Sequence, residues 1–251
     1  MTAAQGYRTE RFASIDSTNA EALRRAAAGD PGRLWIVAGL QTSGRGRRGR
    51  QWSSPPGNLH SSLLLRPAVP ASRLHELGFV AGVALTEAVR AAADAGAAEA
   101  VLKWPNDLLV DGAKVAGILI ETEADRLSPQ PVAVGIGVNC MHAPPDTPYR
   151  ATTLEALGGA ADPVRLFAEL HRAMRHWLGV WEEGGFAPVR ARWSALSMPE
   201  GAGISVSLGE TRVEGRYGGI DDNGALRLVT DAGTRTIQAG DVYPASAVEP
   251  V

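Results

Sequence analysis

Apolar residues recur along the chain at spacings that predict a series of helices and strands. Residues 17–28 are expected to form a short helix, because Thr18 and Glu21 match the spacing of a capping box. A continuous apolar run at 34–40 is typical of a buried strand. A second apolar segment at 59–66 predicts another strand. The stretch between these strands is rich in Gly, Arg, Ser and Pro and predicts a loop.

The middle of the chain continues this alternation. From 73 to 96 the apolar residues share one helical face, which predicts a longer helix. Four shorter segments then predict strands, at 100–103, 107–110, 114–121 and 131–138. Asp111-Gly112, between the second and third of these, is a strong hairpin signal. Asp162-Pro163 suits the N-cap and first position of another helix, and a further helix is expected near 187–197.

The pattern changes near residue 198. Beyond that point, short strand-like segments alternate with turns that contain glycine, which is typical of a small all-β barrel. We therefore expect two domains, a larger one over residues 1–198 and a β-barrel over residues 199–251.

Composition and charge narrow the class of protein. Hydrophobic residues make up 45% of the chain and charged residues 21%, so a sizeable core can be buried. The net charge of −2 gives no general attraction to nucleic acid or to an anionic membrane, and neither partner is expected. Cys140 is the only cysteine, and the N-terminus has no apolar stretch that could be a signal peptide, so a reducing cytoplasm is the expected compartment.

The segment from Gly44 to Arg50, GRGRRGR, combines four arginines with three glycines. Glycine lets backbone N–H groups turn toward a ligand, and arginine is a forked donor for carboxylate or phosphate, so the combination suits an anion-binding loop. By composition alone, an arginine-rich nucleic-acid segment and a solvated flexible loop fit equally well. The position after a buried strand, in a slightly acidic chain, favours the anion-binding interpretation.

A second polar cluster lies in residues 103–121, KWPNDLLVDGAKVAGILIE. Lys103 ends one expected strand. Asn106 and Asp107 begin the next strand, where they could position a phosphate or a metal ion or cap the turn. Lys114 lies early on the return strand beside small residues, so its side chain could face a ligand. A lysine that guards the edge of a sheet is the equally weighted alternative.

Two smaller motifs add to this picture. VGIGVN at 134–139 places two glycines in a strand, which indicates close approach by a ligand or by another stretch of backbone. Ser17, Thr18 and Asn19, at a helix start, could cap the helix or bind a ligand, with equal weight. The five histidines have no metal-ligand spacing, and no Ser-His-Asp or Cys-His set stands out, which argues against structural zinc and against a nucleophilic hydrolase.

Taken together, the motifs STN, GRGRRGR, KWPND, KVAGILIE and GIGVN, in this order, resemble those of the biotin–protein ligases. The C-terminal GIDDNGALRL resembles the small SH3-like barrel of that family. The resemblance implies an α+β fold, with a central mixed β-sheet flanked by helices in a catalytic domain like that of class II synthetases and lipoate ligases. Because STN begins at residue 17, no room is expected for the N-terminal DNA-binding domain of some members, and a monofunctional enzyme is implied.

The activity that the resemblance implies has two steps. Biotin and ATP give biotinyl-5′-adenylate and pyrophosphate, with Mg²⁺ on the phosphates. The biotinyl group then passes to one lysine of a biotin carboxyl carrier domain, usually in an acyl-CoA carboxylase. A monomer or a weak homodimer is expected. Lipoate or octanoate ligases are the alternative; a nucleic-acid-binding module and a non-catalytic biotin-binding protein are less favoured.

The resemblance also implies roles for individual residues. The positions that match the biotin site are Ser17, Thr18, Asn19, Gln41, Arg45, Gly46, Arg47, Lys114 and Gly117. Those expected at ATP and its ion are Arg48, Trp52, Lys103, Asn106, Asp107 and Asn139. The expected catalytic set is Lys114, Arg45, Arg47 and Asp107, with Asp107 a candidate for helping to deprotonate the acceptor amine. The adenine contact is left open, since Tyr149 is the only Phe, Tyr or Trp in MHAPPDTPYRATTLEAL, the stretch that follows GIGVN.

Overall fold

The computed structural model describes residues 6–92, 99–122, 129–145, 147, 150–158 and 161–244. Most of this chain surrounds a seven-stranded sheet with the strand order β1-β2-β3-β7-β6-β5-β4. The strands are β1 (Arg8–Phe12), β2 (Leu34–Ala38), β3 (Leu59–Leu65), β4 (Val101–Lys103), β5 (Asp107–Val110), β6 (Ala113–Thr122) and β7 (Val132–Val138). β1 pairs with β2 in parallel, and the other neighbours are antiparallel, so the sheet is mixed, as expected.

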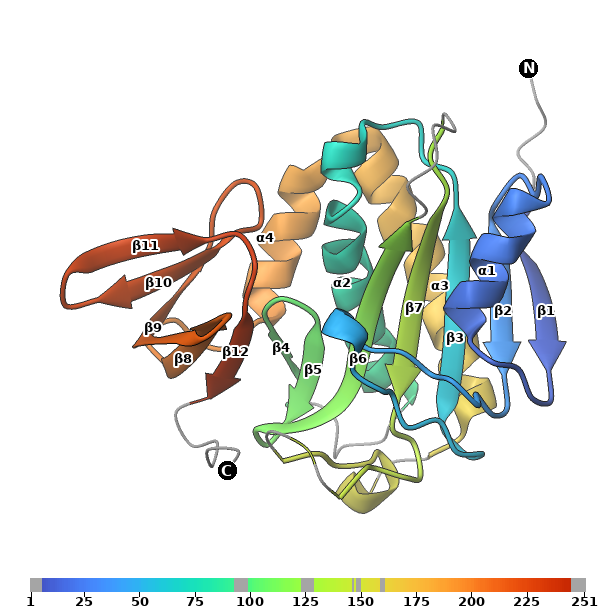
Figure 1. The fold of residues 1–251 in the computed structure, drawn as a ribbon, viewed down its shortest axis with the longest axis horizontal. Coiled ribbons are helices and arrows are strands. Elements are labelled where there is room, and N and C mark those ends of the chain that lie inside the picture. Colours follow the sequence, from blue (N-terminus) through green and yellow to red (C-terminus); the bar gives the residue numbers. More distant parts are fainter. Residues whose placement is uncertain are drawn as a thin grey trace.

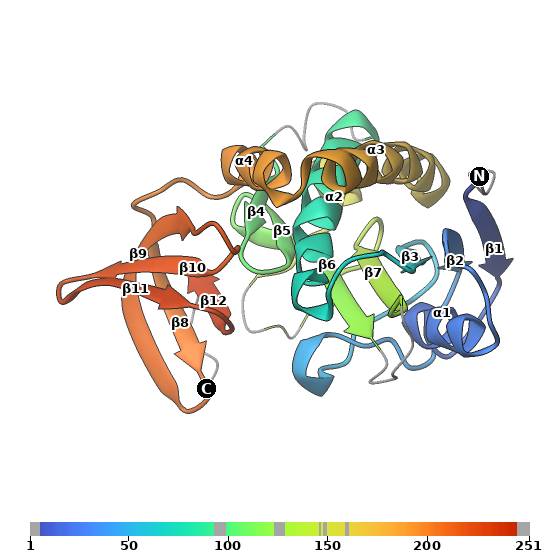
Figure 2. The ribbon, with the colours of Figure 1, turned by 90° about the horizontal axis from the view of Figure 1, so that it is seen from above.

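Helices cover both faces of this sheet (Figures 1 and 2). α2 (Glu76–Ala92), α3 (Pro163–Gly184) and α4 (Phe186–Leu196) lie on one face, where α2 packs on the sheet and against the other two helices. α1 (Thr18–Ala27) lies on the opposite face and packs on β2, β3 and β7. The apolar stripe of α3 faces the core from Leu166 to Trp181, with Phe167 and Trp181 buried and Trp177 partly buried. The expected mixed sheet flanked by helices is therefore confirmed.

Three local expectations need correction. The N-cap of α1 is Ser17, whose Oγ accepts from the Ala20 N–H at 3.4 Å, and Glu21 pairs with arginines of its own helix instead of closing a capping box. The strand β1 was not predicted, because its sequence RTERF is mostly polar and its side chains are partly exposed at the sheet edge. The long helix begins at Glu76, after a short 3₁₀ turn at Ala71–Arg73, and residues 93–98 lie outside the described residues.

The C-terminal part of the chain forms a separate five-stranded antiparallel sheet with the order β11-β10-β9-β8-β12. Its strands are β8 (Gly203–Leu208), β9 (Thr211–Ile220), β10 (Leu226–Thr230), β11 (Gly233–Ile237) and β12 (Asp241–Pro244). Val206, Tyr217, Leu226 and Leu228 are buried at its centre. The arrangement is consistent with the expected small SH3-like barrel.

The barrel lies against the β4–β5 end of the large sheet (Figure 1). Lys103 Nζ donates to the Val242 carbonyl at 2.8 Å, and the Trp104 indole N–H donates to the Gly224 carbonyl at 2.9 Å. Apolar residues of the barrel and of the sheet face under α2 belong to one continuous buried cluster, while Leu34, Ile36 and Leu64 form a second cluster with α1. These contacts bring β12 to the edge of the cavity described below.

Candidate active site

A cavity of about 710 Å³ opens at the centre of the large sheet, on the face that carries α1. Its walls come from the start of α1, the arginine-rich loop after β2, the ends of β4 to β7, and β12 of the barrel. Every residue predicted for the site except Arg48 lines this cavity. The structure therefore joins segments that are separated by more than two hundred positions in the sequence.

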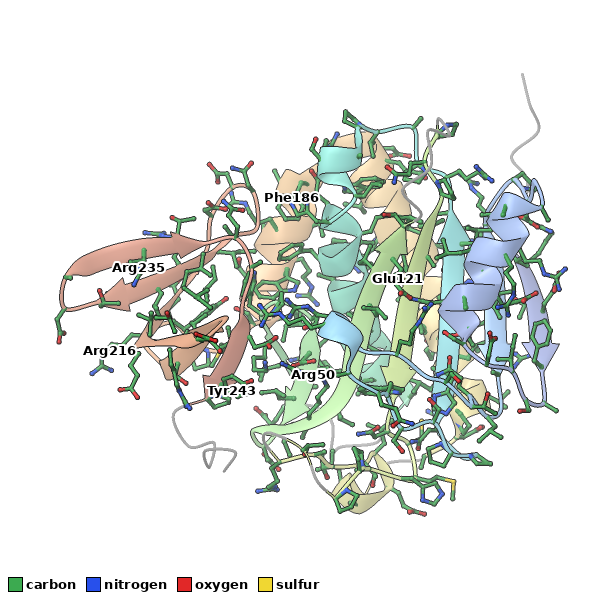
Figure 3. The ribbon with its side chains drawn as sticks, viewed as in Figure 1. Arg50, Glu121, Phe186, Arg216, Arg235 and Tyr243 are labelled. Carbon is green, nitrogen blue, oxygen red and sulfur yellow. The ribbon has the colours of Figure 1, made fainter. Side chains whose placement is uncertain are left out.

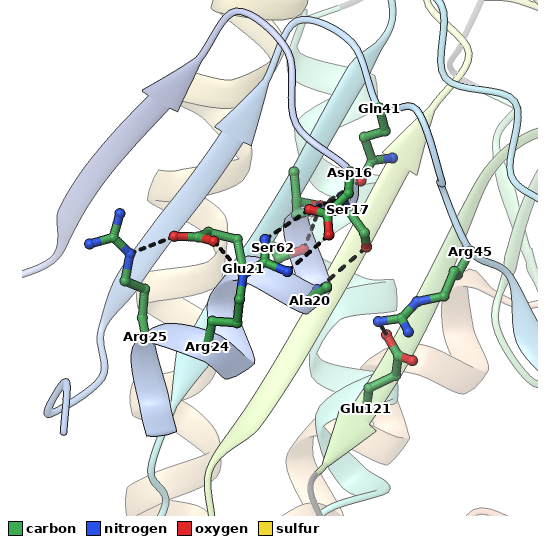
Figure 4. Close-up of polar contacts among 11 residues, drawn as sticks. Asp16, Ser17, Ala20, Glu21, Arg24, Arg25, Gln41, Arg45, Ser62 and Glu121 are labelled. Carbon is green, nitrogen blue, oxygen red and sulfur yellow. Dashed lines mark hydrogen bonds and ion pairs between the residues drawn. The ribbon is translucent and has the colours of Figure 1, made fainter. Parts of the chain in front are cut away.

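One wall of the cavity is a connected network of polar side chains (Figure 4). Gln41 Oε1 accepts from the backbone N–H of Thr18 at 2.8 Å and from its hydroxyl at 3.0 Å. Ser62 Oγ donates to Asn19 Oδ1 at 2.5 Å, and the Asn19 amide group donates to Glu121 Oε2 at 2.8 Å. Because each partner fixes the next, the wall presents hydroxyl and amide groups in defined orientations.

The floor of the cavity consists of backbone, because glycines stand where β6 and β7 pass beneath it. Gly117 and Gly137 are register partners, and the Trp52 indole lies over both. A Cβ atom at Gly137 would lie 2.5 Å from Trp52 Nε1, and one at Gly135 would lie 2.4 Å from Asn19 Oδ1. The two glycines of VGIGVN do mark a close approach, but the groups that approach are the side chains of Asn19 and Trp52 and not another stretch of backbone.

A buried ion-pair triad stands at one end of the cavity. The Asp107 carboxylate lies 3.0 Å from Lys103 Nζ through one oxygen and 2.5 Å from Lys114 Nζ through the other. Lys103 is 2% exposed, and burial lowers the pKa of its ammonium group, while the charge of Asp107 acts in the opposite direction. Lys114 is a cavity residue and not a solvent-facing edge lysine, because β5 and β7 flank its strand and its Nζ lies 5.4 Å from the centre of the Trp52 ring.

The arginine-rich loop crosses the cavity between two carboxylates. At its start, Arg45 pairs with Glu121 of β6 at 3.3 Å. Further along, Arg47 donates to Asn106 Oδ1 at 3.2 Å and to the Gly240 carbonyl at 3.2 Å. Gly44 permits this path, because a Cβ atom there would lie 2.5 Å from both Ser54 Oγ and the Trp52 carbonyl.

The far end of the loop meets the barrel at Asp241. Its carboxylate accepts from Arg47 at 3.5 Å and from Arg48 at 3.3 Å, and it also pairs with Arg50. Figure 3 labels Arg50 beside Tyr243, which is also on β12. Burial lowers the pKa of Arg47, and the charges of the neighbouring arginines add to this effect, while the carboxylates oppose it.

Several cavity residues were not found from the sequence. Asp241 and Ser54 line the cavity, and Ser62, which does not line it, holds Asn19 of the polar wall in place. All three lie outside the recognised motifs, and only the folded chain brings them to the other site residues. His60 lines the cavity, fully buried, with its Nε2–H donating to the Pro55 carbonyl at 3.1 Å; burial lowers its pKa and so favours the neutral ring. All seven residues of β3 are buried, so the predicted strand at 59–66 gives a place for His60 but not its role.

Arg48 and Asn139, both predicted at the ATP site, make contacts with other parts of the chain. Arg48 does not line the cavity and instead faces Asp241, with a positive φ of 56°. The Asn139 amide group donates to the Thr152 carbonyl at 3.3 Å, so it also fixes the segment after β7. Tyr149, left open for adenine, lies outside the described residues.

Comparison with known proteins identifies the family to which this cavity belongs. Residues 12–139 match the model of the biotin/lipoate A/B protein ligase family, and residues 203–243 match the biotin protein ligase C terminal domain. The chain belongs to the biotin/lipoate A/B protein ligase family. The matched segments contain the polar wall described above, the arginine-rich loop and Asp241.

Relatives in this family align along nearly the whole chain. The chain is 41% identical over 238 residues to the biotin–[acetyl-CoA-carboxylase] ligase of Paracoccus denitrificans, covering 92% of this chain and 98% of that one. It is 33% identical to the bifunctional ligase/repressor BirA of Escherichia coli, covering 93% of this chain and 73% of that one. The biotin protein ligase of Aquifex aeolicus, solved in complex with biotin and ATP, superposes with a TM-score of 0.81 at 28% identity, covering 95% of this chain and 99% of that one.

Proposed function

We propose that this chain is a biotin–protein ligase that activates biotin with ATP and transfers the biotinyl group to a lysine of a carrier domain. The observation that supports it most strongly is the placement of Arg45, Arg47 and Lys114 around one cavity whose opposite wall is a fixed polar network. A pocket of this kind suits a ligand with a polar ring, an apolar stem and a carboxylate. Lipoate, the alternative substrate, has no ureido group to use the polar wall.

The polar wall is assigned to the biotin ring. Ser17, Thr18, Asn19 and Gln41 present hydroxyl and amide groups that match the donors and acceptors of a ureido group. Gly117 supplies the backbone floor beneath the apolar stem. The hydrogen bonds of this wall hold its side chains in place before a ligand arrives, which lowers the cost of ordering them on binding.

The cationic side of the cavity is assigned to the first chemical step. A biotin carboxylate must approach the α-phosphate of ATP, and like charges oppose that approach. Arg45, Arg47 and Lys114 offset this repulsion, and they stabilise charge that develops on the phosphate oxygens as pyrophosphate leaves. Gly46 lets the loop backbone pass close to the reacting groups, because no side chain stands between its two neighbouring arginines.

The nucleotide is assigned to the end of the cavity near the barrel. Trp52, Lys103, Asn106 and Asn139 line the cavity and are assigned to the nucleotide, with Trp52 also covering the floor at Gly117. Arg48 would reach a phosphate only by leaving Asp241. The described residues offer no cluster of three or more side chains that suits a metal ion, and Asp107 and Asp241 are already paired with cations. These residues therefore do not form a binding site for Mg²⁺. The ion would instead be coordinated by the ATP phosphates and by water molecules, and it would enter with the nucleotide.

The second step needs a neutral acceptor amine. Asp107 remains our candidate for assisting its deprotonation, because it is the carboxylate beside Lys114 in the cavity. Its contacts with two ammonium groups give it a second role, which is to hold Lys114 toward the reacting groups. The attacking lysine expels AMP from the biotinyl-adenylate and forms the amide bond to biotin.

The same proposal assigns an acceptor protein, a domain organisation and a compartment. The acceptor is assigned to a biotin carboxyl carrier domain of an acyl-CoA carboxylase, in keeping with the name of the Paracoccus relative. We assign residues 1–198 to the catalytic domain and residues 199–251 to the SH3-like domain of a cytoplasmic monomer or weak homodimer. No helix in the described part of the chain is long and apolar enough to cross a bilayer.

ATP–pyrophosphate exchange tests the proposal. Purified protein should exchange labelled pyrophosphate into ATP when biotin is supplied and not when lipoate replaces it. Mass spectrometry of a carrier domain incubated with the enzyme, biotin and ATP should show one added biotinyl group. Exchange that depends on lipoate alone would select the lipoate ligase instead.

A further inference from the structure

Three arginines of the loop converge on one carboxylate from the barrel. Asp241 is 8% exposed and contacts Arg47, Arg48 and Arg50, while the remaining loop arginine, Arg45, pairs with Glu121 on the other side of the cavity. The Arg47 guanidinium also donates to the carbonyl of Gly240, the residue before Asp241. The loop is therefore attached to the barrel through the Asp241 carboxylate, the Gly240 carbonyl and a contact between Arg50 and Tyr243.

The charges in this cluster do not balance. Three guanidinium groups carry three positive charges, and Asp241 returns one negative charge. Arg48 and Arg50 are about half exposed and solvent screens them in part, but Arg47 is more deeply buried and its neighbours repel it. Asp241 limits this repulsion and leaves an excess of positive charge that faces the cavity.

We propose that Asp241 is a positioning residue that holds the arginine loop against the barrel until a polyphosphate takes its place as the partner of the arginines. This inference rests on the proposed function for the identity of the anion. A pyrophosphate group carries several negative charges and more acceptor oxygens than a carboxylate, so it competes well for forked donors. Asp241 and the polyphosphate also repel each other across the shared arginines, and the carboxylate therefore weakens polyphosphate binding.

Neutralising Asp241 should have two effects of opposite sign. Asp241→Asn removes the charge that holds the loop, so the loop should open more often in the ligand-free enzyme. The same substitution removes a competitor of the polyphosphate, so pyrophosphate should bind more tightly. A residue that only supported the local structure would loosen the loop and weaken pyrophosphate binding together.

Trypsin measures the first effect directly, because it cleaves after the arginines of this loop. In ligand-free protein, cleavage within residues 44–50, identified by mass spectrometry, should be about three- to tenfold faster in Asp241→Asn than in the natural protein. Asp241→Glu keeps the charge and should stay near the natural rate. Asp231→Asn removes an exposed carboxylate from the β10–β11 turn of the same barrel and should change nothing.

Calorimetric titration with inorganic pyrophosphate measures the second effect. The Kd of Asp241→Asn for pyrophosphate should fall about three- to tenfold relative to the natural protein, with the two control variants close to it. Saturating pyrophosphate should also slow the cleavage of all folded variants to a common rate. Circular dichroism establishes that each variant is folded before either measurement.

The outcomes separate this inference from the proposed function. Weaker or unchanged pyrophosphate binding in Asp241→Asn, or unchanged cleavage of its loop, overturns the role of Asp241. Absence of biotin-dependent exchange in the natural protein overturns the proposed function, and the cleavage and titration results still decide whether Asp241 competes with phosphate.

Discussion

Asp107 and Lys114 lie on adjacent strands with the carboxylate oxygen 2.5 Å from the ammonium nitrogen. The other oxygen of Asp107 contacts Lys103, which is almost entirely buried and also donates to the barrel. One carboxylate therefore supports a cavity lysine and a lysine at the junction of the two sheets.

Asp107→Asn should destabilise the fold, because it leaves the Lys103 ammonium group buried without its counter-charge. Loss of one partner of a buried ion pair typically costs about 3–5 kcal/mol, and urea unfolding measures the change. Asp222→Asn is the matched control, since the side chain of Asp222 is 88% exposed and its ion pair is on the surface. Equal loss of stability in both variants would show that the buried triad contributes no more to stability than an exposed ion pair.

Lys114→Ala should reduce biotin-dependent ATP–pyrophosphate exchange by about 10²–10³-fold, because the cavity loses a cation near the reacting phosphate. Lys114→Arg keeps the charge but not its geometry and should recover only part of the rate. Arg172→Ala, which removes an exposed cation from α3, is the control. A folded Lys114→Ala protein with the natural rate would show that the assignment of Lys114 is wrong.

Gly137→Ala should raise the KM for biotin at least about tenfold, because the new methyl group would displace Trp52 from the floor of the cavity. Steady-state exchange kinetics measure the KM, and indole fluorescence reports the movement of the ring. Gly179→Ala in α3, where a Cβ atom meets nothing within 4 Å, should leave both unchanged. An unchanged KM in Gly137→Ala would mean that Trp52 does not shape the biotin site.

The pH dependence of stability should reveal the buried ring of His60. Its folded pKa is lowered by burial, so below the unfolded pKa of about 6.5 the unfolded chain takes up a proton that the folded chain refuses. Stability is therefore lost as pH falls from about 6.5 toward the folded pKa, with a slope of at most about 1.4 kcal/mol per pH unit. The His60→Gln variant, compared by urea unfolding between pH 7.5 and 5.5, should lose less; His171 has the same direction of shift and is common to both proteins.

Much of the fold could be predicted because its signals are local. The hairpin at Asp111-Gly112 has the positive φ values that its sequence requires, and Asp162 caps α3 as its position before Pro163 indicates. β1 could not be predicted, because a polar edge strand is stabilised by pairing with β2 and not by its own pattern. The predicted capping box of α1 is wrong by one residue for a similar reason. The Thr18 hydroxyl donates to Gln41, which is distant in the sequence, and Ser17 caps the helix.

The part of the candidate site that comes from contiguous sequence motifs could be predicted. GRGRRGR and KWPND place cations and polar groups at strand ends, and the sheet then brings them to one cavity. Asp241 could not be identified in this way, because a lone acidic residue in a short strand has no pattern of its own. Its partners are almost two hundred positions away, and only the docking of the barrel puts them within reach.

The lysines on either side of Asp107 are the only two in the whole sequence. The surface cations of this protein are therefore arginines, whose guanidinium groups stay protonated and are poor nucleophiles. If an activated acyl group escapes from the cavity, it meets no lysine amine on the outside of the enzyme that made it. Outside the cavity, the acceptor lysine of another protein then has no competing lysine on the catalyst, so the surface of the enzyme is not acylated by the intermediate that it forms.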